Sequence, residues 1–176
     1  AGREDIDVLC LGGRNFVIEV VEPKKRKISL KRLETSVNKK NKGIIEISDL
    51  EFADKNKVIA VKSAKAKKTY KVIVKTDSAV TKTSLKKLGE LVTIIKQQTP
   101  TRVVHRRADI IRKRSVYSLE HKFIDKTHVE LVIQTEAGLY IKELVSGDEG
   151  RSRPSVCALL GVKAVVENLE VVGFED

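Results

Sequence analysis

The order in which strand and helix patterns follow one another constrains the fold of this chain more than any other feature of its sequence. Runs of valine, isoleucine and leucine that alternate with polar residues predict strands. Two of these runs flank Gly12-Gly13, which predicts a hairpin with a glycine turn. The predicted strands cover residues 6–11, 15–21, 44–52, 69–75, 129–135 and 162–172, and residues 101–119 are also rich in β-forming residues.

Apolar residues at helical spacing separate these strands. Helices are predicted at residues 30–37, 55–63, 139–145 and 155–160. The first rests on the spacing of Leu30, Leu33 and Val37, and the second follows an Asp54 cap. A further helix is predicted to start at a Thr83 cap and to carry Leu85, Leu88, Val92 and Ile95 on one face. Residues 147–154 are predicted to form a polar loop.

This order lacks the regular strand–helix–strand alternation of a doubly wound fold. We therefore predict an α+β fold, with a mixed and mostly antiparallel sheet and flanking helices. The sequence has no internal repeat and no long linker, so residues 1–176 are expected to form a single domain.

Charge gives the clearest indication of a partner. The chain has 35 Lys and Arg against 24 Asp and Glu, a formal net charge of +11. Such a field attracts polyanions, so nucleic acid is the first expected partner and an anionic membrane surface the second. A basic surface that only keeps the protein soluble is the alternative. Charge alone provides neither sequence specificity nor chemistry.

The remaining composition bears on location. No apolar run reaches the length of a transmembrane helix, and no secretory pattern opens the sequence. Cys10 and Cys157 lack metal-ligand spacing, which predicts reduced thiols in an intracellular, cytoplasmic protein. The chain begins with Ala1 and contains no methionine, which favours a domain cut from a longer protein.

A carboxylate cluster precedes the first predicted strand. In a strand that starts at Asp5, the side chains of Asp5 and Asp7 share one face. Asp5 could act alone as a nucleophile or an acid–base catalyst. Alternatively, Glu4, Asp5 and Asp7 could hold a magnesium ion for phosphate chemistry. A solvated turn with a capping aspartate explains the same residues without any function.

Several basic and aromatic side chains are candidates for contacts with RNA. Tyr70 stands among lysines, so its ring could stack on a base, although a core tyrosine fits the pattern equally well. Lys142 lies in an apolar stretch and would need a carboxylate such as Asp5 if it is buried, or it is an ordinary surface lysine. The candidate phosphate contacts are Arg102, His105, Arg106, Arg107, Arg151 and Arg153.

Five stretches, in this order, resemble one family of RNA-modifying enzymes. They are AGREDIDV at 1–8, KKTYKVIV at 67–74, QTPTRVVHRRAD at 98–109, EAGLYIKELVSGDEGRSRPS at 136–155 and VENLEVV at 166–172. Together they resemble the archaeal and eukaryotic tRNA pseudouridine(54/55) synthases, the tenth named family of pseudouridine synthases. The likeness covers nearly the whole chain, although Leu9 stands where the family usually has an arginine.

The resemblance implies a pseudouridine synthase fold with a central RNA-binding cleft, and it implies roles for five residues. Asp5 falls on the catalytic aspartate, and Tyr70 on the tyrosine that stacks on the target uracil. Lys142 replaces the arginine that other pseudouridine synthases pair with the aspartate. Ile141 and Leu169 fall on the pocket wall.

The resemblance also implies a partner and a setting. The expected partner is the T arm of tRNA, bound by a cytoplasmic monomer that uses no cofactor and no metal. The family's N-terminal RNA-binding domain, with its cysteine zinc site, is absent from this sequence. A non-catalytic RNA-binding module and a metal-dependent nuclease remain the alternatives to an isomerase.

Overall fold

The computed structural model describes residue 5 and residues 7–175 and divides the chain into two compact units. The first unit includes Asn15–Ser63, and the second comprises Gly2–Arg14 together with Ala64–Asp176. The single domain expected over residues 1–176 stays a prediction.

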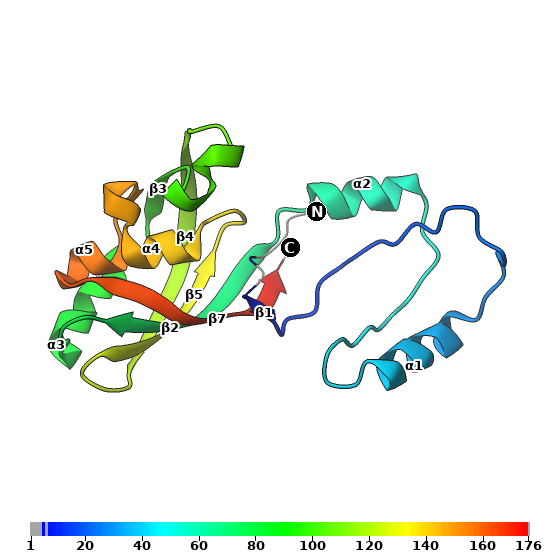
Figure 1. Ribbon diagram of the computed structural model, residues 1–176, viewed down its shortest axis with the longest axis horizontal. Coiled ribbons are helices and arrows are strands. Elements are labelled where there is room, and N and C mark those ends of the chain that lie inside the picture. The colour runs from blue at the N-terminus through cyan, green and yellow to red at the C-terminus, as the bar shows by residue number, and fades with distance from the viewer. Residues whose placement is uncertain (1–4, 6, 176) are drawn as a thin grey trace. The chain divides into compact units, whose positions relative to one another are not determined.

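The first unit contains two helices joined by extended chain (Figure 1). Helix α1, Leu30–Lys40, starts where the Ser29 side chain accepts a hydrogen bond from the backbone N–H of Arg32. Helix α2, Lys55–Ser63, starts in the same way, with the Asp54 carboxylate accepting from the N–H of Lys57. Both helices confirm the prediction, including the Asp54 cap.

The predicted strand at residues 44–52 is wrong, because none of its residues pairs with a strand. The side chain of Asn38 accepts from the N–H of Ile47 and donates to the carbonyl of the same residue, both at 2.8 Å. A side chain of α1 therefore occupies backbone groups that a neighbouring strand would otherwise bind. Ile44 and Phe52 are largely exposed, so the alternating pattern has no core to face.

The second unit is built on a seven-stranded mixed sheet in the order β1-β7-β2-β5-β4-β3-β6 (Figure 1). Among the strand pairs of the described residues, only β1–β7 is parallel, which confirms the predicted mostly antiparallel sheet. The strands are β1 Leu9–Cys10, β2 Lys67–Thr76, β3 Ile94–Gln98, β4 Ile111–Phe123, β5 His128–Thr135, β6 Ser152–Arg153 and β7 Ala164–Glu175.

The core lies against the central strands β2, β5 and β7. Alternate residues of β5 are buried, from Val129 through Leu131 and Ile133 to Thr135, which is the period of a strand with one face in the core. This cluster continues into helix α4, Ile141–Ser146, and helix α5, Val156–Leu160. The predicted strands at 69–75, 129–135 and 162–172 and the predicted helices at 139–145 and 155–160 are confirmed apart from their ends.

The helix predicted from a Thr83 cap as far as Ile95 is only partly confirmed. Thr81, not Thr83, caps α3, Lys82–Leu85, and a 3₁₀ helix η1, Lys86–Leu91, follows. The buried side chains Leu85, Leu88 and Leu91 are three residues apart, which suits the three-residue turn of a 3₁₀ helix. Ile95 then belongs to strand β3, so a single apolar series spans two kinds of element.

The predicted hairpin around Gly12-Gly13 is also wrong. Strand β1 pairs with β7, and the backbone N–H groups of Leu11 and Gly12 both donate to the carbonyl of Val171. A Cβ atom on Gly12 would lie 2.9 Å from the backbone nitrogen of Gly173. Gly12 therefore permits close passage beside another strand, and residues 15–21 form no strand.

Two short 3₁₀ segments lie in the regions expected to be β-rich or loop. Segment η2, Thr101–Arg106, precedes β4, and η3, Asp148–Gly150, precedes β6. No helix in the described part of the chain is long and apolar enough to cross a membrane.

Candidate active site

Asp5 lies just before β1, where the chain makes a turn closed by a hydrogen bond from the Val8 N–H to the Asp5 carbonyl. Its carboxylate faces the guanidinium of Arg102 from η2. The Asp5 Oδ2 atom is 2.8 Å from Nη2 of Arg102, and Oδ1 is 3.1 Å from Nη1. About one third of the Asp5 side chain is exposed, so the carboxylate remains open to solvent or substrate while it is paired.

Lys142 on α4 belongs to the same cluster, with a different main partner from the one predicted. Its Nζ atom lies 3.9 Å from Oδ2 of Asp5, but 2.6 and 2.8 Å from the two carboxylate oxygens of Asp7. The hydrogen bonds that Lys142 donates lower the pKa of Asp7. The predicted pairing of Lys142 with Asp5 is thus a contact at 3.9 Å, and among the described residues Arg102 lies closer to the Asp5 carboxylate.

Arg102 is held between two carboxylates. Its Nε donates to Oε1 of Glu143 at 2.7 Å, and its two Nη atoms bind Asp5. Burial disfavours the charged form of Arg102, but the hydrogen bonds to Glu143 and Asp5 outweigh this effect and raise its pKa above the ordinary value. The guanidinium is therefore a permanent positive charge beside Asp5.

Helix α4, which carries Lys142 and Glu143, is fastened to strand β3. The amide side chain of the buried Gln97 donates to the carbonyl of Tyr140 and accepts from its N–H, each at 2.9 Å. Both backbone groups of Tyr140 are thus satisfied at the start of α4. This contact fixes the point from which the lysine and the glutamate project.

The three residues expected to form the uracil pocket are all buried. Tyr70 on β2, Ile141 on α4 and Leu169 on β7 belong to one hydrophobic cluster. Only 4% of Tyr70 is exposed, so a uracil could reach its ring only after neighbouring side chains move.

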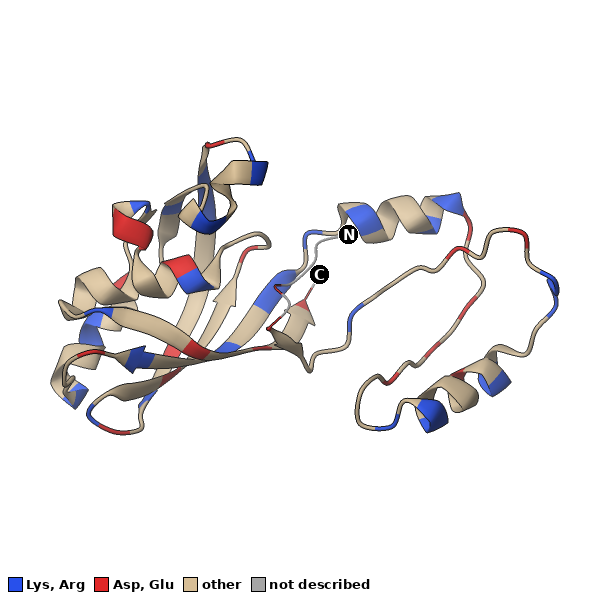
Figure 2. Cartoon of the chain, viewed as in Figure 1, with Lys and Arg blue, Asp and Glu red and all other residues tan. Residues whose placement is uncertain are grey.

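The six candidate phosphate contacts fall into different environments. His105 and Arg106 are exposed on η2, and Arg153 is exposed on β6. Arg107 donates to the hydroxyl of Tyr140 at 2.8 Å. Lysine and arginine are spread over both units and are not confined to one element (Figure 2).

Arg102 and Arg151 have internal partners that the sequence did not predict. Arg151 donates twice to the carbonyl of Thr99, at 2.8 and 3.1 Å, and also binds the carboxylate of Asp109. These contacts give Arg151 a structural role in holding the chain that leads into η2.

Glu143 was not identified from the sequence. Its position next to Lys142 fits the polar face of an amphipathic surface helix, but only 8% of its side chain is exposed. The one available signal was its position in an otherwise apolar stretch, from Leu139 to Val145, where a charge needs a partner.

Cationic partners already occupy two of the three carboxylates considered for a magnesium site. Asp5 is bound by Arg102 and Asp7 by Lys142, so a divalent ion would have to displace both side chains. Glu4, the third candidate, lies outside the described residues, and among those described no cluster of three or more His, Cys, Asp or Glu side chains is arranged to hold a metal.

The fold and the sequence both have counterparts among known proteins. A chain in the crystal structure of a Cbf5–Nop10–Gar1 complex superposes with a TM-score of 0.52 and 25% identity, over 64% of this chain and 32% of that chain. A protein of Methanothrix thermoacetophila named tRNA pseudouridine synthase Pus10 is 44% identical over 174 residues, which is 98% of this chain and 38% of the relative. The same name is given to a protein of Methanothermobacter marburgensis, 46% identical over 98% of this chain and 43% of the relative.

The mixed sheet with its flanking helices is a pseudouridine synthase fold. Within that class, the family model described as Pus10, C-terminal, matches residues 1–175, and the chain belongs to the Pus10 family. It spans about two fifths of the length of the two relatives described above.

Proposed function

We propose that this chain is the catalytic part of a tRNA pseudouridine synthase and that residues 1–176 form one catalytic domain. The substrate is a uridine of the T arm, at position 54, 55 or both. The observation that carries the proposal is the pairing of Asp5, in a chain of this family, with Arg102 and Lys142. The protein is expected to act as a cytoplasmic monomer without a cofactor or a metal.

The reaction breaks the bond between N1 of uracil and C1′ of the ribose and forms a bond from C5 to C1′. The proton leaves C5 and a proton is taken up at N1, so substrate and product have the same composition. Asp5 either attacks C1′ or removes the neighbouring proton from C2′. In either role the carboxylate of Asp5 is the reacting group, and Arg102 and Lys142 lie within ion-pair distance of it.

The target base has to leave its stack before the enzyme can reach the sugar. Stacking on Tyr70 would offset about 1–3 kcal/mol of that cost. Ile141 and Leu169 lie in the same buried cluster and would keep the detached uracil from escaping while it rotates. Tyr70 is also the candidate to receive the proton from C5.

The basic side chains around η2 supply the electrostatic part of RNA binding. Arg106, Arg107, His105 and Arg153 are the proposed backbone contacts. Contacts of this kind orient the RNA, and they depend on charge more than on sequence.

The test maps pseudouridine on an unmodified tRNA transcript after incubation with the wild-type protein and with Asp5→Asn. The wild type is expected to release tritium from C5-labelled uridine and to form pseudouridine in the T arm. Asp5→Asn should bind the transcript with nearly unchanged affinity and make no product. Appreciable product from this variant would contradict the role of Asp5.

The same experiment separates the other two functions. An RNA-binding module would bind the transcript without releasing tritium in the wild type. A nuclease would cut the strand in a reaction that EDTA stops, whereas EDTA should not affect pseudouridine formation.

A further inference from the structure

The buried carboxylate of Glu143 has no evident function in the chemistry described so far. Its Oε1 atom accepts from Nε of Arg102, while Oε2 is buried and has no hydrogen-bond partner among the described residues. A buried carboxylate is costly unless a charged partner compensates it. Glu143 therefore depends on Arg102 for its only described ion pair.

Arg102 uses three nitrogen atoms for two carboxylates. Nε points to Glu143, and Nη1 and Nη2 each bind one oxygen of Asp5. Two parallel hydrogen bonds between a guanidinium and a carboxylate fix the orientation of both groups, which a lysine cannot do. An arginine that serves mainly to bind phosphate would keep these donors available for RNA.

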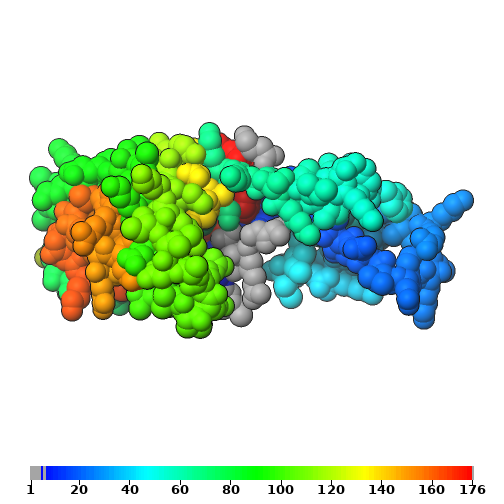
Figure 3. Space-filling model, turned by 90° about the horizontal axis from the view of Figure 1, so that it is seen from above, coloured from blue at the N-terminus to red at the C-terminus, as the bar shows by residue number. Residues whose placement is uncertain are grey.

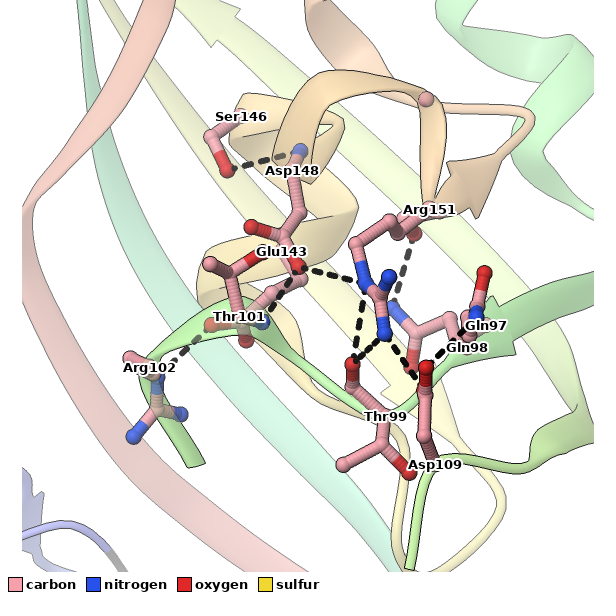
Figure 4. A network of polar contacts seen from close by, with 12 residues as sticks. Gln97, Gln98, Thr99, Thr101, Arg102, Asp109, Glu143, Ser146, Asp148 and Arg151 are labelled. Carbon is pink, nitrogen blue, oxygen red and sulfur yellow. Dashed lines mark hydrogen bonds and ion pairs between the residues drawn. The ribbon is translucent and has the colours of Figure 1, made fainter. Parts of the chain in front are cut away.

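The backbone that carries Arg102 is itself anchored (Figure 4). The N–H of Thr101 donates to Oδ2 of Asp148 at 2.9 Å, and Arg151 binds the carbonyl of Thr99. Asp148 and Glu149 both have positive φ angles, 45° and 54°, a conformation that costs free energy for residues other than glycine. Such backbone strain persists only where surrounding contacts hold the loop in one conformation, as the hydrogen bond between Thr101 and Asp148 does here.

Two segments far apart in the sequence therefore meet at this point. In the space-filling view, the segment around residue 100 and the segment from α4 to α5 lie side by side on one face (Figure 3). The hydrogen bonds of Arg151 with Thr99 and of Arg102 with Glu143 join them.

We propose that Arg102 and Glu143 are positioning residues that hold the Asp5 carboxylate in its reactive orientation, with Glu143 anchoring Arg102 and Arg102 anchoring Asp5. The inference rests on the proposed function, and it replaces the phosphate contact predicted for Arg102 from sequence. While Asp5 acts on the ribose, Glu143 holds the guanidinium of Arg102 in place beside it.

The experiment measures the single-turnover rate at saturating tRNA transcript and, separately, the dissociation constant. The variants are Glu143→Gln, Arg102→Gln, Arg102→Lys and the double variant with glutamine at both positions. A misplaced catalytic group can cost about 100-fold in rate. We expect Glu143→Gln and Arg102→Gln to lower the saturating rate by about 10- to 100-fold, with dissociation constants within about twofold of the wild type.

The coupling between the two residues gives a second readout. If Glu143 acts only through Arg102, the double variant is no slower than Arg102→Gln, since residues in one network are not additive. Arg102→Lys keeps the charge without the two parallel bonds, so it should remain slow. A phosphate contact would behave in the opposite way, with weaker binding in Arg102→Gln that lysine restores.

Glu90→Gln removes an exposed carboxylate of the same unit and serves as the matched control, with thermal unfolding measured for every variant. If Glu143→Gln does not fold, the two variants of the partly exposed Arg102 carry the test. Unchanged saturating rates in the folded variants, or additive losses in the double variant, would overturn the inference. A wild-type protein that makes no pseudouridine would contradict the proposed function instead.

Discussion

Lys142 and Glu143 are adjacent residues whose side chains serve different partners. Lys142 binds Asp7 and lies within ion-pair distance of Asp5, whereas Glu143 is buried against Arg102. Adjacent residues on a helix point in different directions. Lys142 therefore binds Asp7 directly, while Glu143 reaches Asp5 only through Arg102.

Replacing Lys142 by methionine tests how a positive charge beside the two aspartates contributes to the reaction. We expect Lys142→Met to lower the single-turnover rate by about tenfold or more, since each 1.36 kcal/mol lost from the transition state is a factor of ten. The affinity for tRNA should change much less. The rate and the dissociation constant are measured separately on the same transcript.

Lys142→Arg is the conservative variant and should retain most of the rate, because the charge is kept. Lys126→Met, in the turn between β4 and β5, removes a charge at the other end of β5 from α4 and should have little effect. Weaker binding with an unchanged rate in Lys142→Met would make this lysine a phosphate contact.

At the scale of elements, the β4–β5 turn depends on one carboxylate. Asp125 accepts from the backbone N–H groups of Thr127 and His128, at 2.7 and 2.8 Å. The backbone hydrogen bond from Thr127, together with the hydrogen bond between the His128 imidazole and the same carboxylate, lowers the pKa of Asp125 to about 2. The ionised form is thus the one that closes the turn between β4 and β5.

This turn predicts a pH dependence of stability. The pKa of Asp125 is lower in the folded chain than its ordinary value of 3.8, so its stabilising contribution is complete above that value. The contribution is lost as pH falls from about 4 toward about 2. The stability difference between the wild type and Asp125→Ala, measured by urea unfolding, should therefore narrow across this range.

Asp125→Asn is the matched control for this prediction. Asparagine can still accept hydrogen bonds but does not titrate, so its stability difference from Asp125→Ala should stay constant between about pH 4 and about pH 2. A difference between the wild type and Asp125→Ala that does not change with pH would contradict the role given to the charge.

At the scale of the whole molecule, a net charge of +11 predicts salt-dependent binding of tRNA. Each phosphate contact that is lost should reduce the slope of log affinity against log salt concentration by about 1. We expect Arg106→Ala and Arg153→Ala each to reduce the slope by about that amount. Affinities measured between about 50 and 200 mM salt provide the test.

Lys126→Ala controls for the loss of one positive charge on the same unit. It should weaken binding only slightly and leave the slope nearly unchanged. Equal slopes for Arg106→Ala, Arg153→Ala and the wild type would mean that these arginines do not contact the RNA backbone.

Much of the fold could be predicted because local patterns and tertiary contacts agree. The alternating residues of β2 and β5 fit a sheet with one face in the core, and α2 starts at the predicted Asp54 cap. At Gly12-Gly13, by contrast, the local pattern predicted a hairpin that the tertiary structure does not contain. A pair of glycines fits a tight turn and also fits close passage beside another strand, and only the presence of β7 decides between them.

The sequence by itself determined the α+β class and most of the central strands, because these depend on local periodicity. The resemblance of an ordered series of motifs predicts Asp5 as the catalytic carboxylate. Tertiary structure alone decided which cation binds which carboxylate. Arg102 is 97 residues from Asp5 along the chain, and Lys142 is 135 residues from Asp7. Residue patterns depend on neighbours along one strand or helix. Ion pairs over such separations form only when the folded sheet has brought η2 and α4 close to Asp5 and Asp7.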